Sequence, residues 1–184
     1  MDILEKLYTR EDYAAFTKLP ENRGRRFELI HGEIVEKVTT EEHSIIAGLI
    51  ITEINLYFRQ NKIGRAGVEM SHAVPDDDIN ERIPDVSVRI HPPDAISRKG
   101  AVNEMPEIAI EIKSPGNTYK SLRAKAEYYL RHGAQSVWLI YPEKRLIEVY
   151  HQSADIKILT GQDTLTEDAL LPGFSVAVST IFDV

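Results

Sequence analysis

Two short apolar segments of the chain carry charged side chains where charge is expensive to bury. Asp85 lies in segment 83–88, and Glu111 and Lys113 lie in segment 108–113, where isoleucine recurs at every second position. Because successive side chains of a strand point to opposite faces, Glu111 and Lys113 share the face opposite the isoleucines. A carboxylate in so apolar a run needs compensation, either from Lys113 or from a divalent metal shared with Asp85. An Asp at a strand start followed by Glu-x-Lys on a later strand is what metal-dependent cleavage of a phosphodiester needs.

This chemistry requires the two segments to be neighbouring strands. Neighbouring strands lie about 5 Å apart, so the Asp85 and Glu111 carboxylates would then reach one Mg²⁺. Magnesium favours one or two carboxylates together with waters and phosphate oxygens, and Mn²⁺ is the alternative cofactor. Lys113 would hold an attacking water or stabilise charge on the phosphate. We therefore expect Asp85, Glu111 and Lys113 to act together as a catalytic group.

Three other residues are candidates for the same pocket. Lys125 lies at helical spacing from Leu122 and Tyr129, on or beside the apolar stripe of a helix, so we expect it to point toward the polar pocket as a fourth catalytic residue. Glu28 alternates with apolar neighbours, which favours a solvated strand face, while the functional interpretation places it in the acidic pocket. His43, near a helix start, is either structural or exposed, or binds substrate.

A strand–helix–strand unit must position these residues. The segments 107–113, 118–132 and 136–141 read as a strand, a helix with Gly133 at its C-terminal end, and a buried strand. Such a unit joins two parallel strands by a right-handed crossover. The resulting fold class is α/β, a mixed β-sheet flanked by helices.

The remaining elements follow from apolar periodicity and turn residues. A short helix is expected near 9–19, a longer one over 41–61, strands at 67–74 and 84–90, and hairpins at 26–38 and 145–159. The first hairpin turns at His31-Gly32 and is expected as an N-terminal addition to the sheet.

Composition sets the class of protein. The chain has 184 residues, 42% hydrophobic and 28% charged, which is ordinary for one soluble domain spanning 1–184. It has no cysteine, so disulfides and thiolate chemistry are excluded. Segment 1–6 lacks the layout of a signal peptide and no run is long enough to span a membrane, so we expect a cytoplasmic protein. The formal net charge of −7 argues against tight nonspecific binding of nucleic acid over the whole surface.

The order of these motifs resembles one branch of the PD-(D/E)XK nuclease superfamily, the Uma-type putative restriction endonuclease family. The motifs that carry the resemblance, over roughly 8–172, are Phe27 to Val35, His43, Pro84-Asp85-Val86, Glu111 to Pro115, Lys125 with Tyr129, Gly133, and Val137-Trp138-Leu139. The chain departs from the family at His31, where an Asp is frequent, and at Lys113, where many relatives carry an apolar residue.

The resemblance implies a restriction-endonuclease-like fold and cleavage of nucleic acid, with DNA as the expected substrate, by a homodimer. It implies Asp85 and Glu111 as metal ligands, the Ile112 carbonyl as a third ligand, and Lys113 as the catalytic lysine. The alternative is a nuclease-like fold that serves as a noncatalytic binding or oligomerisation module, and a third hypothesis is a hydrolase of small phosphate esters.

Several other charged or aromatic groups have simpler interpretations. The run 76–78 is better explained as a solvated turn than as a metal site. Basic residues of the 118–132 helix are either solvated surface charges or a phosphate-facing patch: Lys120, Arg123 and Arg131. Tyr128 and Tyr129 are expected in the core rather than as platforms for bases.

Overall fold

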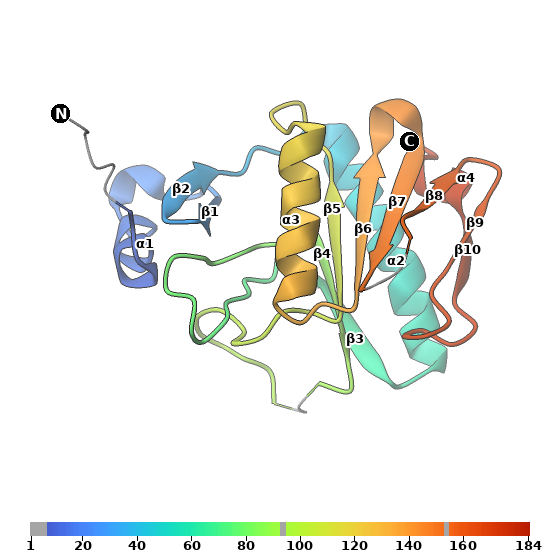
Figure 1. Ribbon diagram of the computed structural model, residues 1–184, viewed down its shortest axis with the longest axis horizontal. Coiled ribbons are helices and arrows are strands. Elements are labelled where there is room, and N and C mark those ends of the chain that lie inside the picture. Colours follow the sequence, from blue (N-terminus) through green and yellow to red (C-terminus); the bar gives the residue numbers. More distant parts are fainter. Residues whose placement is uncertain (1–6, 93–94, 153–154) are drawn as a thin grey trace.

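The central feature of the computed structural model is a six-stranded mixed sheet, with strand order β3-β4-β5-β6-β7-β8 (Figure 1). The structure describes residues 7–92, 95–152 and 155–184. Segment 1–6, which is not expected from its sequence to form a signal peptide, lies outside the described residues. The strands are β3 (Gly64–Val68), β4 (Val86–Ile90), β5 (Ile108–Ile112), β6 (Ser136–Tyr141), β7 (Leu146–His151) and β8 (Lys157–Thr160). None of the helices in the described part of the chain combines the length and apolarity needed to cross a membrane.

The expected strand–helix–strand unit is present. β5 and β6 are parallel, with Glu111 opposite Leu139, and α3 (Tyr119–Arg131) connects them. Thr118 caps this helix by accepting from the backbone N–H of Ser121, and Gly133, with a φ of 117°, follows the C-cap residue. β4 pairs antiparallel with β5, with Val86 opposite Ile110, so Asp85, which directly precedes β4, lies beside the strand that carries Glu111.

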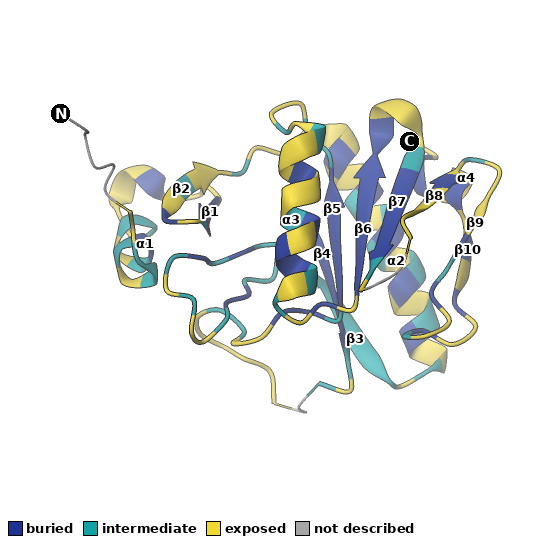
Figure 2. Ribbon diagram, in the orientation of Figure 1, coloured by how far each residue is buried: buried dark blue, intermediate teal, exposed yellow. Residues whose placement is uncertain are grey.

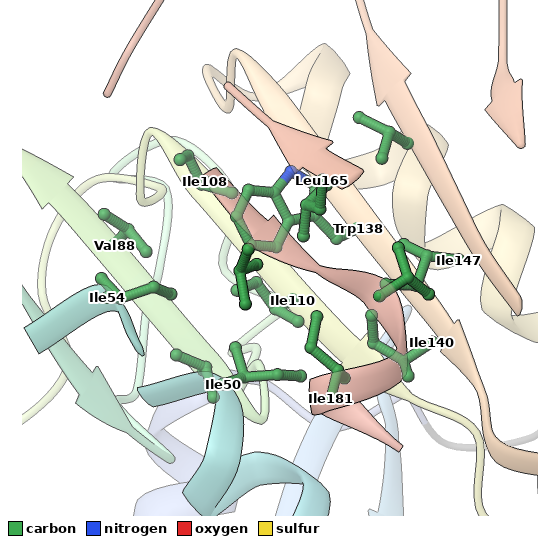
Figure 3. Packing of buried hydrophobic residues seen from close by; sticks show 14 of the residues in the cluster. Ile50, Ile54, Val88, Ile108, Ile110, Trp138, Ile140, Ile147, Leu165 and Ile181 are labelled. Atoms are coloured by element: carbon green, nitrogen blue, oxygen red, sulfur yellow. The ribbon is translucent and has the colours of Figure 1, made fainter. Parts of the chain in front are cut away.

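The alternation along β5 divides the core into two layers. Ile108, Ile110 and Ile112 pack in a cluster that also contains buried residues of α2 (Glu41–Gln60), and Ala109 packs with the buried face of α3. Figure 3 shows the first cluster, in which Ile50 and Ile54 of α2 approach Ile110 and Trp138 of the sheet. Figure 2 shows that the central strands are buried throughout, whereas α3 exposes its outer face. A helix on each face makes β5 a central strand whose polar groups are enclosed.

The N-terminal hairpin forms its own two-stranded sheet, so the expectation that it adds strands to the main sheet is wrong. β1 (Phe27–Ile30) and β2 (Glu33–Glu36) pair antiparallel through His31 and Gly32, whose φ values are 51° and 80°. Backbone hydrogen bonds between Leu29 and Glu81, 3.0 and 2.9 Å long, attach the hairpin to the chain before β4. The short helix α1 (Arg10–Phe16) begins at a capping box formed by Thr9 and Asp12 and packs on the hairpin. The hairpin therefore lies beside the start of β4, where Asp85 is found.

The strand predicted at 67–74 is wrong in its bounds. β3 begins at Gly64, where an added Cβ atom would lie 2.5 Å from the Arg89 carbonyl oxygen, so glycine permits the close pairing with β4. The strand ends before Glu69, whose positive φ of 49° turns the chain away. The C-terminal residues form a second small hairpin, β9 (Thr164–Thr166) with β10 (Ser175–Ala177), followed by α4 (Val178–Ile181).

Buried His72 makes folding stability depend on pH. Its side chain is 0% exposed, with Nδ1 2.8 Å from the Glu104 carbonyl oxygen and Nε2 3.0 Å from Ser87 Oγ. Burial, with a contribution from Arg89, lowers the pKa of His72 to about 4. Because the folded-state pKa is depressed, the neutral ring stabilises the fold above the unfolded pKa of about 6.5, and this stabilisation is lost as pH falls toward 4.

We expect this loss to reach about 3 kcal/mol for the His72 ring. Urea unfolding of the wild-type protein and His72→Gln at pH 7, 5.5 and 4 measures it. The difference in unfolding free energy between the two proteins should shrink as pH falls, since glutamine does not titrate. A difference that stays constant over this range would contradict the assignment.

Candidate active site

Asp85, just before β4, is held by three different elements. Its side chain is 2% exposed. Oδ2 accepts a 2.7 Å hydrogen bond from the Ile112 backbone N–H and lies 3.0 Å from His43 Nε2, and Oδ1 lies 2.6 Å from Lys37 Nζ. Burial alone would raise the pKa of Asp85, but the Lys37 ammonium and the His43 contact hold it well below its usual range. Asp85 is thus a fixed, ionised carboxylate at the junction of β4, β5 and α2.

Glu111 of β5 faces the crossover helix. Lys125 Nζ lies 3.2 and 3.1 Å from its two carboxylate oxygens, and the Tyr129 hydroxyl donates a 2.6 Å hydrogen bond to Oε1. The pKa of Glu111 is raised, chiefly by burial and also by the negative charges of Asp85 and Glu28, although Lys125 opposes this shift. Glu111 is therefore a buried carboxylate that Lys125 and Tyr129 hold in place.

Glu28 belongs to the same cluster, so the expectation of a solvated strand face is wrong. It is 3% exposed, because the hairpin folds back against the loop before β4. Oε1 accepts from the Ile83 backbone N–H at 2.9 Å, and Oε2 lies 2.7 Å from Lys125 Nζ. Burial would raise the pKa of Glu28, but Lys125 and then Lys37 lower it below its ordinary value. The carboxylate stays ionised and pairs with Lys125.

Two buried ammonium groups balance much of this charge. Lys125 comes from α3, at the helical position that the sequence indicated. Lys37, which follows β2, was not anticipated from the sequence; its Nζ donates to the Ile83 carbonyl oxygen at 2.6 Å and contacts Asp85. Burial opposes the charge of both lysines, but Glu111 and Glu28 around Lys125, and Asp85 around Lys37, raise both pKa values. Both lysines are therefore protonated at neutral pH.

Lys113 is not brought into this cluster. β5 ends at Ile112, and the Lys113 ammonium lies 3.4 Å from Glu143 Oε1 and 5.4 Å from the centre of the Tyr119 ring. Tyr119 is the first residue of α3, whereas Glu111 contacts Lys125, nearly two turns later in the helix. The strand face that the sequence predicted Lys113 to share with Glu111 ends before Lys113. The catalytic role of Lys113 stays a prediction.

The cluster forms the floor of a cavity of about 510 Å³. Its walls are the N-terminal hairpin with the linker to α2 on one side, and the loop 114–117 with the start of α3 on the other. The residues that line it include Glu28, Lys37, His43, Asp85, Glu111, Ile112 and Lys125, whereas Lys113 does not line it. A ligand entering the cavity would meet three carboxylates and two ammonium groups.

The donor set fits a hard divalent cation. Asp85, directly before β4, and Glu111 of the neighbouring β5 supply carboxylate oxygens, and the backbone N–H of Ile112, the residue after Glu111, donates to Asp85. In the directly contacting cluster, three carboxylates contact two ammonium groups. A ready-made group of three His, Asp or Glu side chains spaced for a metal is absent from the described residues, so the Ile112 carbonyl or solvent would complete the shell.

The other charged groups lie outside this cluster. Asp77 accepts from the Tyr128 hydroxyl at 2.7 Å and from Asn80, which supports the turn interpretation of 76–78. Arg123 pairs with buried Glu148, and Lys120 and Arg131 are exposed. Tyr128 and Tyr129 are core residues, as expected.

Comparison with known proteins agrees with this architecture. The sequence profile of the Uma2 family, described as "Putative restriction endonuclease", matches residues 11–179. A crystal structure described as "a putative nuclease belonging to DUF820", from Anabaena variabilis ATCC 29413, matches with a TM-score of 0.78 and 24% identity, over 95% of this chain and 97% of that chain. This likeness confirms the mixed-sheet fold that the sequence predicted. No curated protein matches the chain.

Proposed function

Since this chain belongs to the Uma2 family, as the order of its motifs predicted, we propose that it is a nuclease that hydrolyses phosphodiester bonds of DNA with the help of Mg²⁺ or Mn²⁺. The observation that supports this proposal is the convergence of Asp85 and Glu111 on neighbouring strands at the floor of a cavity. Buried ionised groups with strongly shifted pKa values are costly for stability and are concentrated at functional sites.

In this proposal Asp85 and Glu111 hold the cation, with the Ile112 carbonyl as a third ligand. A cation held there would supply a Lewis acid for a phosphate oxygen and would lower the pKa of a water molecule. His43 and the Ile112 N–H fix the Asp85 carboxylate, so one of its oxygens keeps a constant orientation. Tyr129 does the same for Glu111.

Lys125 is the proposed catalytic lysine. Its ammonium contacts Glu28 and Glu111 inside the cavity, and a lysine ammonium has three N–H donors. In the structure these donors contact one oxygen of Glu28 and both oxygens of Glu111, so a phosphate oxygen would take the place of one of the longer contacts to Glu111 and be stabilised as charge develops on it. Lys37, held by Asp85 and the Ile83 carbonyl oxygen, has one N–H left. Glu28 positions Lys125 and keeps it protonated.

The same ion pairs favour a rival function, a noncatalytic module in which the charges serve structure. Lys37 and Lys125 already occupy carboxylate oxygens that a cation would need. A module of this kind would have no requirement for a divalent cation. Cation binding at Asp85 and Glu111 therefore discriminates between the two functions.

The direct test is cleavage of plasmid and oligonucleotide DNA by the purified protein, with Mg²⁺ or Mn²⁺ and with a chelator. We expect strand cleavage that depends on the cation and is lost in Asp85→Ala. Equal cleavage by the wild-type protein and the variant would reject the proposed site, and no cleavage with either cation would favour the noncatalytic module. The expectations of one domain over 1–184, a homodimer and a cytoplasmic location stay predictions.

A further inference from the structure

A second cavity adjoins the first at the proposed reaction centre. Its volume is about 470 Å³, and both cavities are lined by Thr39, His43 and Asp85. A phosphodiester joins two nucleotides, so a reacting phosphate at Asp85 would place one nucleotide on each side of it. We propose that the two cavities form a track for one nucleic-acid strand and that the substrate is single-stranded, an inference that rests on the proposed nuclease function.

The sizes of the cavities support one strand rather than a duplex. Volumes of about 510 and 470 Å³ lie in the range of roughly 300–1,000 Å³ that holds a small organic ligand, such as one nucleotide. The reactive carboxylates are buried at the floor, with Asp85 only 2% exposed. A strand whose nucleotides are free of a partner can enter such cavities, whereas a base pair would first have to open.

The mouths of both cavities carry exposed apolar side chains. Val38, which is 68% exposed, and Val35 line the first cavity, together with Pro115 across from them. Val68, which is 52% exposed, lines the second with Ala47. Apolar surface of this kind suits the faces of unstacked bases, which single-stranded nucleic acid presents and a duplex conceals.

Two buried nitrogen atoms of residues that line the first cavity lack hydrogen-bond partners in the described residues. They are His43 Nδ1 and Arg82 Nε. Arg82 is 2% exposed and stacks on the Tyr128 ring at 4.2 Å. A buried donor or acceptor without a partner is costly. A phosphate oxygen of a bound strand would accept from Arg82 Nε, and a sugar hydroxyl would donate to His43 Nδ1.

The net charge of the chain also favours a single-stranded substrate over a duplex. Duplex DNA carries one negative charge per about 1.7 Å of its axis, and proteins that bind it neutralise many phosphates with Lys and Arg. This chain has a formal net charge of −7, and Arg26 beside the second cavity is paired with Glu69 at 3.0 Å. The cations near the reaction centre, Lys37 and Lys125, lie inside the first cavity, where a single strand can reach them.

The test compares cleavage of a short fluorescein-labelled DNA strand with cleavage of the same strand annealed to its complement, in Mn²⁺. Val38→Glu and Val68→Glu each place a carboxylate at one cavity mouth, and Leu56→Glu is the matched control at an exposed apolar position that lines neither cavity. We expect kcat/KM for the single strand to exceed that for the duplex by about tenfold or more. Each mouth variant should lower kcat/KM for the single strand by about tenfold, which corresponds to the free energy of one lost valine contact. The control variant should leave kcat/KM unchanged.

The outcomes separate this inference from the proposed function. Cation-dependent cleavage that is at least as fast on the duplex would overturn the single-strand substrate and leave the nuclease function standing. Cleavage of the single strand that is unaffected by either mouth variant, or affected by only one, would overturn the two-cavity track. Absence of cleavage on both substrates would reject the nuclease function itself. Asp85→Ala protein, purified in parallel, measures contaminating activity.

Discussion

Replacing Asp85 with asparagine is expected to lower the rate of metal-dependent cleavage by about 10²- to 10³-fold. Asparagine keeps the size of the side chain and an oxygen that can accept from the Ile112 N–H, which Asp85 binds at 2.7 Å. It loses the negative charge that would hold a cation. Single-turnover cleavage of labelled DNA in Mn²⁺ measures the effect.

The control for this substitution is Asp76→Asn, which makes the same chemical change at an exposed residue of the 76–78 turn. Asp85→Asn also leaves the Lys37 ammonium without its carboxylate partner, so the free energy of unfolding of both variants should be measured at the assay temperature. A folded Asp85→Asn protein that cleaves at the rate of the control would contradict the role of Asp85.

Lys125→Met is expected to have the second large effect, on both catalysis and stability. Lys125 neutralises Glu28 and Glu111, which are 3% and 2% exposed, and its removal leaves two buried carboxylates facing each other. Breaking a buried ion pair in this way costs about 3–5 kcal/mol of unfolding free energy. The cleavage rate should fall by about 10²-fold or more, because the donor to the phosphate is lost.

A double variant separates the two effects. Glu28→Gln combined with Lys125→Met removes one carboxylate together with the ammonium, so the unfolding free energy should recover in part while the cleavage rate should not. Recovery of both would mean that Lys125 acts only through stability.

Lys113→Met is the matched control for the choice of lysine. The Lys113 ammonium pairs with the half-exposed Glu143 at 3.4 Å, a contact worth at most about 1 kcal/mol. We expect its loss to leave the cleavage rate close to that of the wild-type protein. A large loss in Lys113→Met with none in Lys125→Met would restore Lys113 as the catalytic lysine.

The arrangement of the sheet at the site was predictable because its signals are local. The alternation of isoleucine with Ala109 and Glu111, and the periodicity of the following helix, are properties of neighbouring residues. They predict the parallel pair β5–β6 and place Lys125 on the face of α3 that meets the sheet.

Glu28 and Lys37 could not be placed in this way. Both lie at the hairpin, and their burial depends on how the hairpin attaches through Leu29 and Glu81 to a loop some 50 residues later. In the sequence of the hairpin by itself, Glu28 alternates with apolar residues, as an exposed side chain would. Lys37 lies at the end of the second strand, where a lysine is ordinarily exposed. Lys113 shows a second limit, since the alternation predicts it on the strand face of Glu111, whereas β5 ends at Ile112 and the Lys113 side chain pairs with Glu143.

The most direct test of the central claim, that Asp85 and Glu111 share one divalent cation, is Mn²⁺ binding measured by titration calorimetry in the absence of nucleic acid. We expect the wild-type protein and Lys113→Met to bind Mn²⁺ alike, and Asp85→Asn and Glu111→Gln each to lose at least about tenfold in affinity, which corresponds to about 1.4 kcal/mol. Mn²⁺ affinity that is the same in all four proteins would contradict the claim and favour a structural role for the buried charges.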